Sequence, residues 1–209
     1  MLKGTAMQKN IKELFKLFGY KKHRNLYFKI KDDILMVINF DKICHSTVLR
    51  VQGSLTPILY DEECWVYGDI LSIWNRGLLF HGIKEEYDIN VSAEELEKVF
   101  AEIEKGLKEK VLPFFENLPI SNKEFCKKYL LPNEKFLQAL FEINYHQDYE
   151  KALFILENLK NLKKRKNMPM TDNEQRLYDF LMEDDKEQIN KLLKEQKEKF
   201  KRKNHKYVK

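Results

Sequence analysis

Three successive runs of residues with the periodicity of β-strands lie between Asn25 and Tyr60. In the first run Leu26, Phe28 and Ile30 alternate with Tyr27, Lys29 and Lys31. Side chains two residues apart lie on the same face of a strand, so this alternation is typical of a half-buried strand. We expect the Leu26 set to face the core and the Tyr27 set to be mostly in contact with water.

The second run is apolar on both faces. It extends from Ile34 to Phe40, after Asp32 and Asp33 at the position of a tight turn, and we expect an interior strand. The third run, Thr47 to Leu55, alternates Leu49, Val51 and Leu55 with polar residues and ends before Pro57. Because the connections are too short for parallel crossovers, the sequence predicts an antiparallel meander.

Helical periodicity flanks these strands. A helix is expected from about Met7 to Phe18, with Gly19 at its end, followed by a solvated basic turn, Tyr20 to Arg24. Ser92 and Glu95 form a capping-box pattern that opens a second helix; its apolar repeat reaches Val111, and Pro113 is expected to end it. Leu78 to Phe80 and Tyr87 to Asn90 suggest one more short strand pair.

Strand patterns are absent from Pro119 onward. Capping boxes at Ser121 and Glu124 and at Thr171 and Glu174 indicate helix starts. Further helices are expected from Pro132, over Tyr149 to Leu162, and from Asp185 to Lys201. The sequence therefore predicts an α+β protein, with a sheet domain at 1–118, covered by helices, and an all-helical appendage at 119–209.

One family resembles the first part of this chain. The segments LFGYKKHRNLYFKI, ILMVINFDK and TVLRVQGSLTPILYDEE follow one another as in the bacterial domain of unknown function forty-three-oh-four. The likeness covers roughly Ile11 to Trp74 and includes Pro57 to Tyr60, similar to a Pro-Leu-Tyr-like segment of that family. A glutamine common in the family near the end of the second strand is missing at Phe40 to Lys42. The resemblance implies an α+β fold and no established activity.

Composition favours a folded cytoplasmic protein. The 209 residues are 43% hydrophobic and include few glycines and prolines. Met1 to Gly19 does not resemble a secretory signal, and no run has the length of a membrane span. The three cysteines, Cys44, Cys64 and Cys126, are far apart, which favours reduced thiols over a disulfide framework.

Positive charge is concentrated at the C-terminus. Lys191 to Lys209 contains eight lysines and one arginine against two glutamates, a net charge of +7 in a chain of +5 overall. A second basic run precedes Met168. The candidate nucleic-acid-binding residues are Lys163, Lys164, Arg165, Lys166, Lys199, Lys201, Arg202 and Lys203. The same pattern is also typical of solvated helix ends.

No sequence motif indicates a catalytic, metal or cofactor site. Cys44 and His45 are adjacent, so on a strand their side chains point to opposite faces and do not pair. Asp61, Glu62 and Glu63 are consecutive, and such neighbours rarely converge on one cation. The five histidines have no metal-ligand spacing. We expect no cofactor and no catalytic residues.

Three functional hypotheses follow. The first is a non-enzymatic interaction protein, a regulator or immunity-type partner, that binds another protein through a sheet edge or the helical appendage. The second is a nucleic-acid-associated accessory protein that uses the basic residues near the C-terminus. The third is a hydrolase with a site near Cys44, Asp61, Glu62 and Glu63. None of the three hypotheses involves binding to a membrane.

Overall fold

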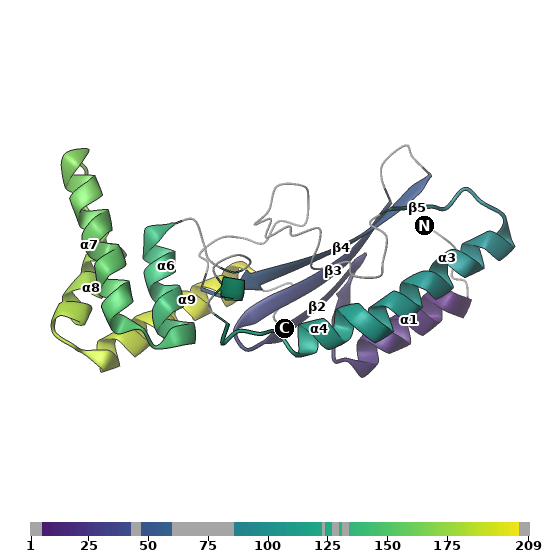
Figure 1. Cartoon of the computed structure of the whole chain (residues 1–209), viewed down its shortest axis with the longest axis horizontal. Helices are drawn as coiled ribbons and strands as arrows, with labels where there is room; N and C mark the ends of the chain where they lie inside the picture. Colours follow the sequence, from purple (N-terminus) through teal and green to yellow (C-terminus); the bar gives the residue numbers. More distant parts are fainter. Residues whose placement is uncertain are drawn as a thin grey trace. The chain divides into compact units, whose positions relative to one another are not determined.

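The computed structural model divides the chain into two compact units (Figure 1). It describes residues 6–42, 47–59, 86–122, 124–126, 130 and 134–204. The sheet unit contains the described residues from 6 to 56 and from 86 to 118. The helical unit contains 57–59 and the described residues from 119 to 204. The predicted α+β layout is confirmed.

The sheet unit is built on one antiparallel sheet. Its described strands, in the spatial order β1-β2-β3-β4-β5, are β1 (Lys21–His23), β2 (Leu26–Lys31), β3 (Ile34–Lys42), β4 (Val48–Pro57) and β5 (Glu86–Asp88). Strand order follows chain order, so the predicted meander is confirmed. The expected strand at Leu78 to Phe80 lies outside the described residues.

The hairpin of β2 and β3 forms because two aspartates adopt left-handed backbone angles. Asp32 and Asp33 have φ of 50° and 61°, as a two-residue turn between twisted strands requires. The turn fixes a register in which Lys31 pairs with Ile34 and Tyr27 with Ile38. β3 is the central strand, and its Ile34, Leu35, Met36 and Ile38 are buried, as its two apolar faces predict.

The basic segment before β2 is a strand, so the prediction of a solvated turn was wrong. Lys21 pairs with Phe28 and His23 with Leu26, which adds an edge strand to the sheet. A turn at Arg24, with φ of 54°, connects β1 to β2. Charged residues are common on edge strands because they discourage pairing with another chain.

Three helices pack in a layer beside the sheet: α1 (Ala6–Leu17), α3 (Ala93–Gly106) and α4 (Leu112–Glu116) (Figure 1). The fully buried Phe15 of α1 stacks on Tyr27 of β2, with ring centroids 3.9 Å apart. The face of β2 that carries Tyr27 therefore points toward the helices, and our prediction of a wet outer face was wrong. Lys29 and Lys31 lie on this face and are half-buried.

The helix that begins after Ser92 continues through Pro113 instead of ending before it. The capping box of Ser92 and Glu95 is confirmed. A π-helical turn, η1 (Leu107–Val111), joins α3 to α4, and the Leu112 amide donates to the Leu107 carbonyl. Pro113, which cannot donate a backbone hydrogen bond, stands directly after this π-helical turn, where the hydrogen-bonding pattern of the helix changes.

In the helical unit, residues 124–126 are helical, and five longer described helical segments follow. These are α6 (Lys135–Phe141), the π-helix η2 (Glu142–His146), α7 (Tyr149–Arg165), α8 (Asp172–Met182) and α9 (Lys186–Lys203). Consecutive α-helices pack together: α6 on α7, α7 on α8, and α8 on α9. The expected helices over Tyr149 to Leu162 and Asp185 to Lys201 are confirmed, each extending a few residues further.

One of the two capping boxes expected here is confirmed. The Thr171 hydroxyl accepts from the Glu174 amide, and Glu174 accepts from the Thr171 amide at 2.6 Å. The prediction that Ser121 caps a helix was wrong, because Asn122 takes that role. Its Oδ1 accepts from the amides of Glu124 and Phe125, both at 3.0 Å.

Candidate functional site

The first basic run lies at the C-terminal end of α7, but its four residues differ in environment. Lys163 is half-buried and forms an ion pair with Glu174 of α8. Lys164, Arg165 and Lys166 are exposed and make no ion pair with the described residues. Three of the four candidate residues therefore offer positive charge to a ligand, whereas the charge of Lys163 is neutralised within the fold.

The second basic group lies at the C-terminal end of α9. Arg202 and Lys203 are exposed, Lys199 is half-buried, and Lys201 pairs with Glu198 at 2.8 Å. The hydrogen bond and charge of Lys201, with charges from Lys194 and Arg202, lower the pKa of Glu198 below its ordinary value. These cations therefore surround one exposed carboxylate, which cancels part of their charge.

The two basic groups do not form one surface. Lys186 at the start of α9 lies over the ring of Tyr149 at the start of α7, 5.4 Å from its centroid. From that shared end the two helices run in different directions (Figure 1). Both basic groups lie at the far ends, so a ligand would meet one group or the other.

A buried carboxylate is the most enclosed charged group of the helical unit. The side chain of Glu142 in η2 is 3% exposed, and its Oε1 accepts from Lys151 Nζ at 2.5 Å. Its Oε2 lies 2.7 Å from Nδ1 of His146, whose side chain is 5% exposed. The other ring nitrogen of His146, Nε2, is buried without a hydrogen-bond partner among the described residues. Sequence reasoning missed this cluster; the His146 and Glu142 spacing of one helical turn is the only signal for it.

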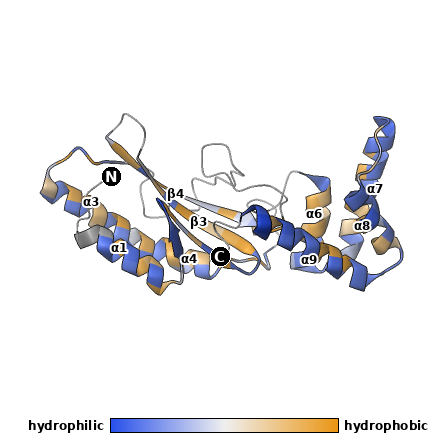
Figure 2. Cartoon of the chain, turned by 180° about the vertical axis from the view of Figure 1, so that it is seen from behind, coloured by the Kyte–Doolittle hydropathy of each residue, from blue (hydrophilic) through white to orange (hydrophobic). Residues whose placement is uncertain are grey.

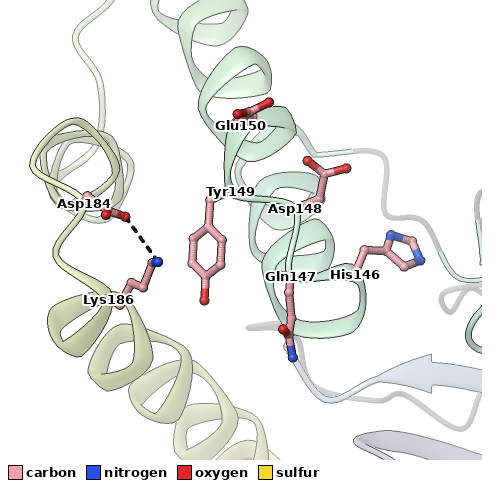
Figure 3. A pocket seen from close by; sticks show the side chains of 7 residues that line it. All are labelled: His146, Gln147, Asp148, Tyr149, Glu150, Asp184 and Lys186. Carbon is pink, nitrogen blue, oxygen red and sulfur yellow. Dashed lines mark ion pairs between the residues drawn. The ribbon is translucent and has the colours of Figure 1, made fainter.

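A shallow depression of about 440 Å³ lies between the start of α7 and the start of α9. Figure 3 shows its lining: His146, Gln147, Asp148, Tyr149, Glu150, Asp184 and Lys186. Asp148 caps α7 by accepting from the Lys151 amide, and Asp184 pairs with Lys186 at 3.7 Å. The His146 ring lies on the opposite side of the backbone from Tyr149 and Lys186 (Figure 3). The polar groups of Asp148, Asp184 and Lys186 thus serve the helix starts.

A cysteine nucleophile is disfavoured at Cys126. Its thiol is fully buried and donates to the Ile120 carbonyl at 3.0 Å. Burial, with the negative charge of Glu142, raises the pKa of Cys126 to about 11, so the reactive thiolate is disfavoured at neutral pH. Residues Cys44, His45, Asp61, Glu62 and Glu63 of the hydrolase hypothesis lie outside the described residues.

The sheet unit also contains a charged cluster, at the ends of α1 and α4. Lys29 Nζ donates to the Phe18 carbonyl at 2.9 Å and to Glu116 Oε1 at 2.7 Å. Lys31 donates to the Glu116 carbonyl and lies 3.4 Å from Glu116 Oε2. Both ammonium groups thus meet the negative ends of helices, where cations are favourable. The cluster joins β2 to the helix layer, and each of its charged groups is paired within it.

Exposed apolar side chains gather in the helical unit. Of the five large apolar residues exposed among the described ones, only Leu17 belongs to the sheet unit. The others are Phe154, Leu162, Met168 and Met182. Phe154 and Leu162 stand on α7 away from its buried stripe of Ala152, Leu156 and Leu159. The offset of Phe154 from this apolar period was readable in the sequence, and our sequence reasoning did not use it, whereas Leu162 follows Leu159 at helical spacing and gives no such signal.

The chain folds back at the end of α7 and places Met168 beside the helix. Asn167 has φ of 54°, and its amide donates to the Lys164 carbonyl at 3.1 Å. The Met168 amide donates to the Lys163 carbonyl at 2.9 Å. These two bonds define a Schellman motif, in which the residue at the position of Met168 frequently contacts the one at Leu162. We use the term α7 surface for Phe154, Leu162, Met168 and the cations Lys164, Arg165 and Lys166.

Comparisons with known proteins assign no relative. No family model matches the sequence, and no curated protein or solved structure is significantly similar to it. The resemblance to the domain of unknown function forty-three-oh-four stays a prediction. None of the described helices combines the length and apolar character needed to cross a membrane. Within the described ranges, no three acidic, histidine or cysteine side chains group as a metal site would need.

Proposed function

We propose that this chain is a non-enzymatic interaction protein of the cytoplasm, a regulator or immunity-type partner, which binds another protein through its helical unit. The observation that supports this proposal is the α7 surface, where three large apolar side chains are exposed along α7 and the turn after it. Isolated exposed apolar residues are ordinary on proteins, but groups of them often mark interaction sites. The buried, reduced thiol of Cys126 is compatible with a cytoplasmic location.

A pull-down from bacterial lysate tests this proposal. The full chain is the bait, at roughly physiological ionic strength, with and without nuclease. We expect one near-stoichiometric protein that survives nuclease and is lost with a Phe154→Ser, Leu162→Ser double variant. Leu17→Ser is the matched control, because Leu17 is also exposed but belongs to the sheet unit. Equal capture by the wild type and the double variant would contradict the proposal, as would recovery of nucleic acid alone.

Nucleic-acid binding through the end of α9 is the second candidate function. It is supported by the convergence of Lys194, Lys201 and Arg202 on one exposed face. Fluorescence anisotropy with labelled single- and double-stranded oligonucleotides tests it. We expect the log–log salt slope to fall by about 2 in Lys201→Gln, Arg202→Gln, since each phosphate contact contributes about 0.9. Lys164→Gln, Arg165→Gln should leave the slope unchanged, because those residues lie on the other basic group; absence of salt-dependent binding eliminates this candidate.

A further inference from the structure

The α7 surface carries positive charge that the fold does not use. Lys163 is paired with Glu174, whereas Lys164, Arg165 and Lys166 are exposed and have no ion-pair partner among the described residues. They follow one another at the negative end of α7, so the helix itself favours cations there. A ligand that contacts this helix end therefore meets three consecutive cations, two in the last turn of α7 and one directly after the helix.

Three exposed apolar side chains accompany these cations on α7 and on the turn that follows it. Phe154 is 63% exposed, Leu162 46% and Met168 54%. Phe154 and Leu162 are eight residues apart, which is about 12 Å along the helix and about 80° around it, so both fall within one broad face. Asn158 stands between them and donates its side-chain amide to the Phe154 carbonyl at 2.9 Å, so it brings no charge to this stripe.

The helix α7 is longer than the helical segment before it, which leaves its C-terminal end beyond α6. α6 and η2 together have 12 residues, whereas α7 has 17. The C-terminal end of α7 extends beyond the end of α6 (Figure 1) and is hydrophilic in the view of Figure 2. The apolar stripe of α7 that packs inside the unit ends with Leu159, three residues before Leu162.

We propose that the partner of the helical unit presents an acidic amphipathic helix, which packs along α7 from Phe154 to the C-terminal end of the helix. Its apolar side chains contact Phe154, Leu162 and Met168, and its carboxylates pair with Lys164, Arg165 and Lys166. Helices commonly recognise such surfaces through apolar anchors spaced by one or two turns. The inference rests on the proposed function and names the chemistry of the partner.

Two other occupants fit the surface less well. A nucleic acid would neutralise the three cations but leave Phe154, Leu162 and Met168 in water. Helices that lie in a lipid interface present a broad apolar face, and the apolar face of α7 is already buried within the unit. An acidic helix satisfies both kinds of side chain, and charge complementarity of this type also speeds association.

Selection from a displayed library of 16-residue peptides, with the full chain as target, tests the inference. We expect enriched sequences to have apolar residues three or four apart and a cluster of Asp or Glu. Binding of a selected peptide, measured by anisotropy, should weaken roughly ten-fold or more in Lys164→Glu, Arg165→Glu, Lys166→Glu and in Phe154→Ser, Leu162→Ser. Lys108→Glu, Lys110→Glu is the charge control, since both residues are exposed in the sheet unit, and it should bind as the wild type does.

Three results would overturn the inference. The first is enrichment of no peptide, or of peptides without acidic residues. The second is equal binding by the charge-reversal variant and the wild type. The third is salt-dependent binding to phosphatidylglycerol vesicles or oligonucleotides that requires Lys164 to Lys166, without any peptide binding. Failure of the proposed function is distinguishable: if the pull-down partner depends on Phe154 and Leu162 but not on the cations, the proposed function stands and only the acidic helix is wrong.

Discussion

The sheet unit and the helical unit differ in how deeply they bury a carboxylate that pairs with lysine. In the sheet unit, two lysine side chains extend across the helix-facing side of β2, and one partly exposed carboxylate, Glu116, serves both. In the helical unit the carboxylate is the buried partner: Glu142 is 3% exposed, whereas its partner Lys151 is 46% exposed. The long aliphatic stem of a lysine lets its ammonium group reach a helix end from within the layer. The shorter side chain of a buried glutamate is stabilised only where the fold places hydrogen-bonding and charged partners next to it.

The units also differ in the apolar surface they leave exposed. Leu17 is the single large apolar residue exposed in the described part of the sheet unit, and four such residues belong to the helical unit. The helix α7 packs on both α6 and α8, and its Phe154 and Leu162 lie outside the stripe that this packing buries. The comparison identifies the helical unit as the one with surface available for a partner.

The largest expected effect is in the core of the sheet unit. Phe15→Ala removes a fully buried ring that stacks on Tyr27 and lies 6.0 Å from the ring of Phe40. We expect the free energy of unfolding to fall by about 3–5 kcal/mol, measured by urea denaturation followed by circular dichroism. Leu17→Ala in the same helix removes an exposed side chain, and its unfolding curve should overlay that of the wild type.

The corresponding variant in the helical unit is Glu142→Ala. It leaves both ring nitrogens of His146 buried without a partner, while Lys151 is able to reach water. We expect a loss of about 2–4 kcal/mol in the free energy of unfolding. Glu157→Ala, at an exposed position of α7, is the matched control. If both variants unfold at the same urea concentration, the buried carboxylate is not a stabilising centre of this unit.

Smaller losses of stability are expected when the capping box of either unit is broken, and the two losses can be compared directly. Thr171→Ala should cost about 0.5–2 kcal/mol, because it releases Glu174, which also holds Lys163. Ser92→Ala should cost less, since its box is exposed and has no such link. Thermal unfolding of the two variants side by side measures this order, and the reverse order would contradict it.

Acid should weaken the capping box of Thr171 and Glu174 in the helical unit, as the same unfolding experiment can measure. Burial by itself raises the pKa of Glu174, but hydrogen bonds and charge from Lys163 and bonds from Thr171 outweigh it, and the pKa lies below its ordinary 4.5. The stabilisation is therefore present above about pH 4.5 and is lost as the pH falls through the lower folded-state pKa. Thr171→Ala should reduce this acid dependence, and an unchanged dependence would contradict the assignment.

The smallest effect at neutral pH is expected at Tyr20 of the sheet unit. Burial, and secondarily the charge of Glu116, raises the pKa of its phenol above the ordinary 10.0. Stability from the neutral phenol is present below pH 10 and is lost as the pH rises above it, because only the unfolded chain then ionises readily. Tyr20→Phe should leave stability near neutral pH unchanged and flatten the alkaline decline, measured by denaturation across pH. An identical decline in the variant would show that Tyr20 ionises freely.

Most elements of the fold were predictable, and the errors have local physical causes. Periodicity identified β2, β3 and β4 and the helices of both units, because burial of one face imposes a period on the sequence. The face of β2 was misassigned because lysines were counted as wet, although Lys29 and Lys31 reach Glu116 across the layer. Pro113 was taken as a helix stop because the π-turn before it leaves no signal in the sequence.

The candidate sites were predictable only in part. The sequence located the basic residues but not their environments: Lys163 is neutralised by a glutamate eleven residues away, and Lys164 is not. It did not indicate the cluster around Glu142, because Lys151 follows a turn at Gln147 that brings it back to η2. Such pairings depend on where helices end and how they pack, which no local pattern encodes.

The sequence by itself determined that this protein has a meander sheet and helices with known starts, because side-chain period and capping are local properties of the chain. Tertiary structure alone decided which charges are neutralised and that Leu162 remains exposed. These outcomes depend on the packing of α7 against a shorter α6 and on the fold-back at Asn167. A residue such as Leu162 is apolar in either setting, and only the neighbouring helix determines whether it belongs to a core or to a binding surface.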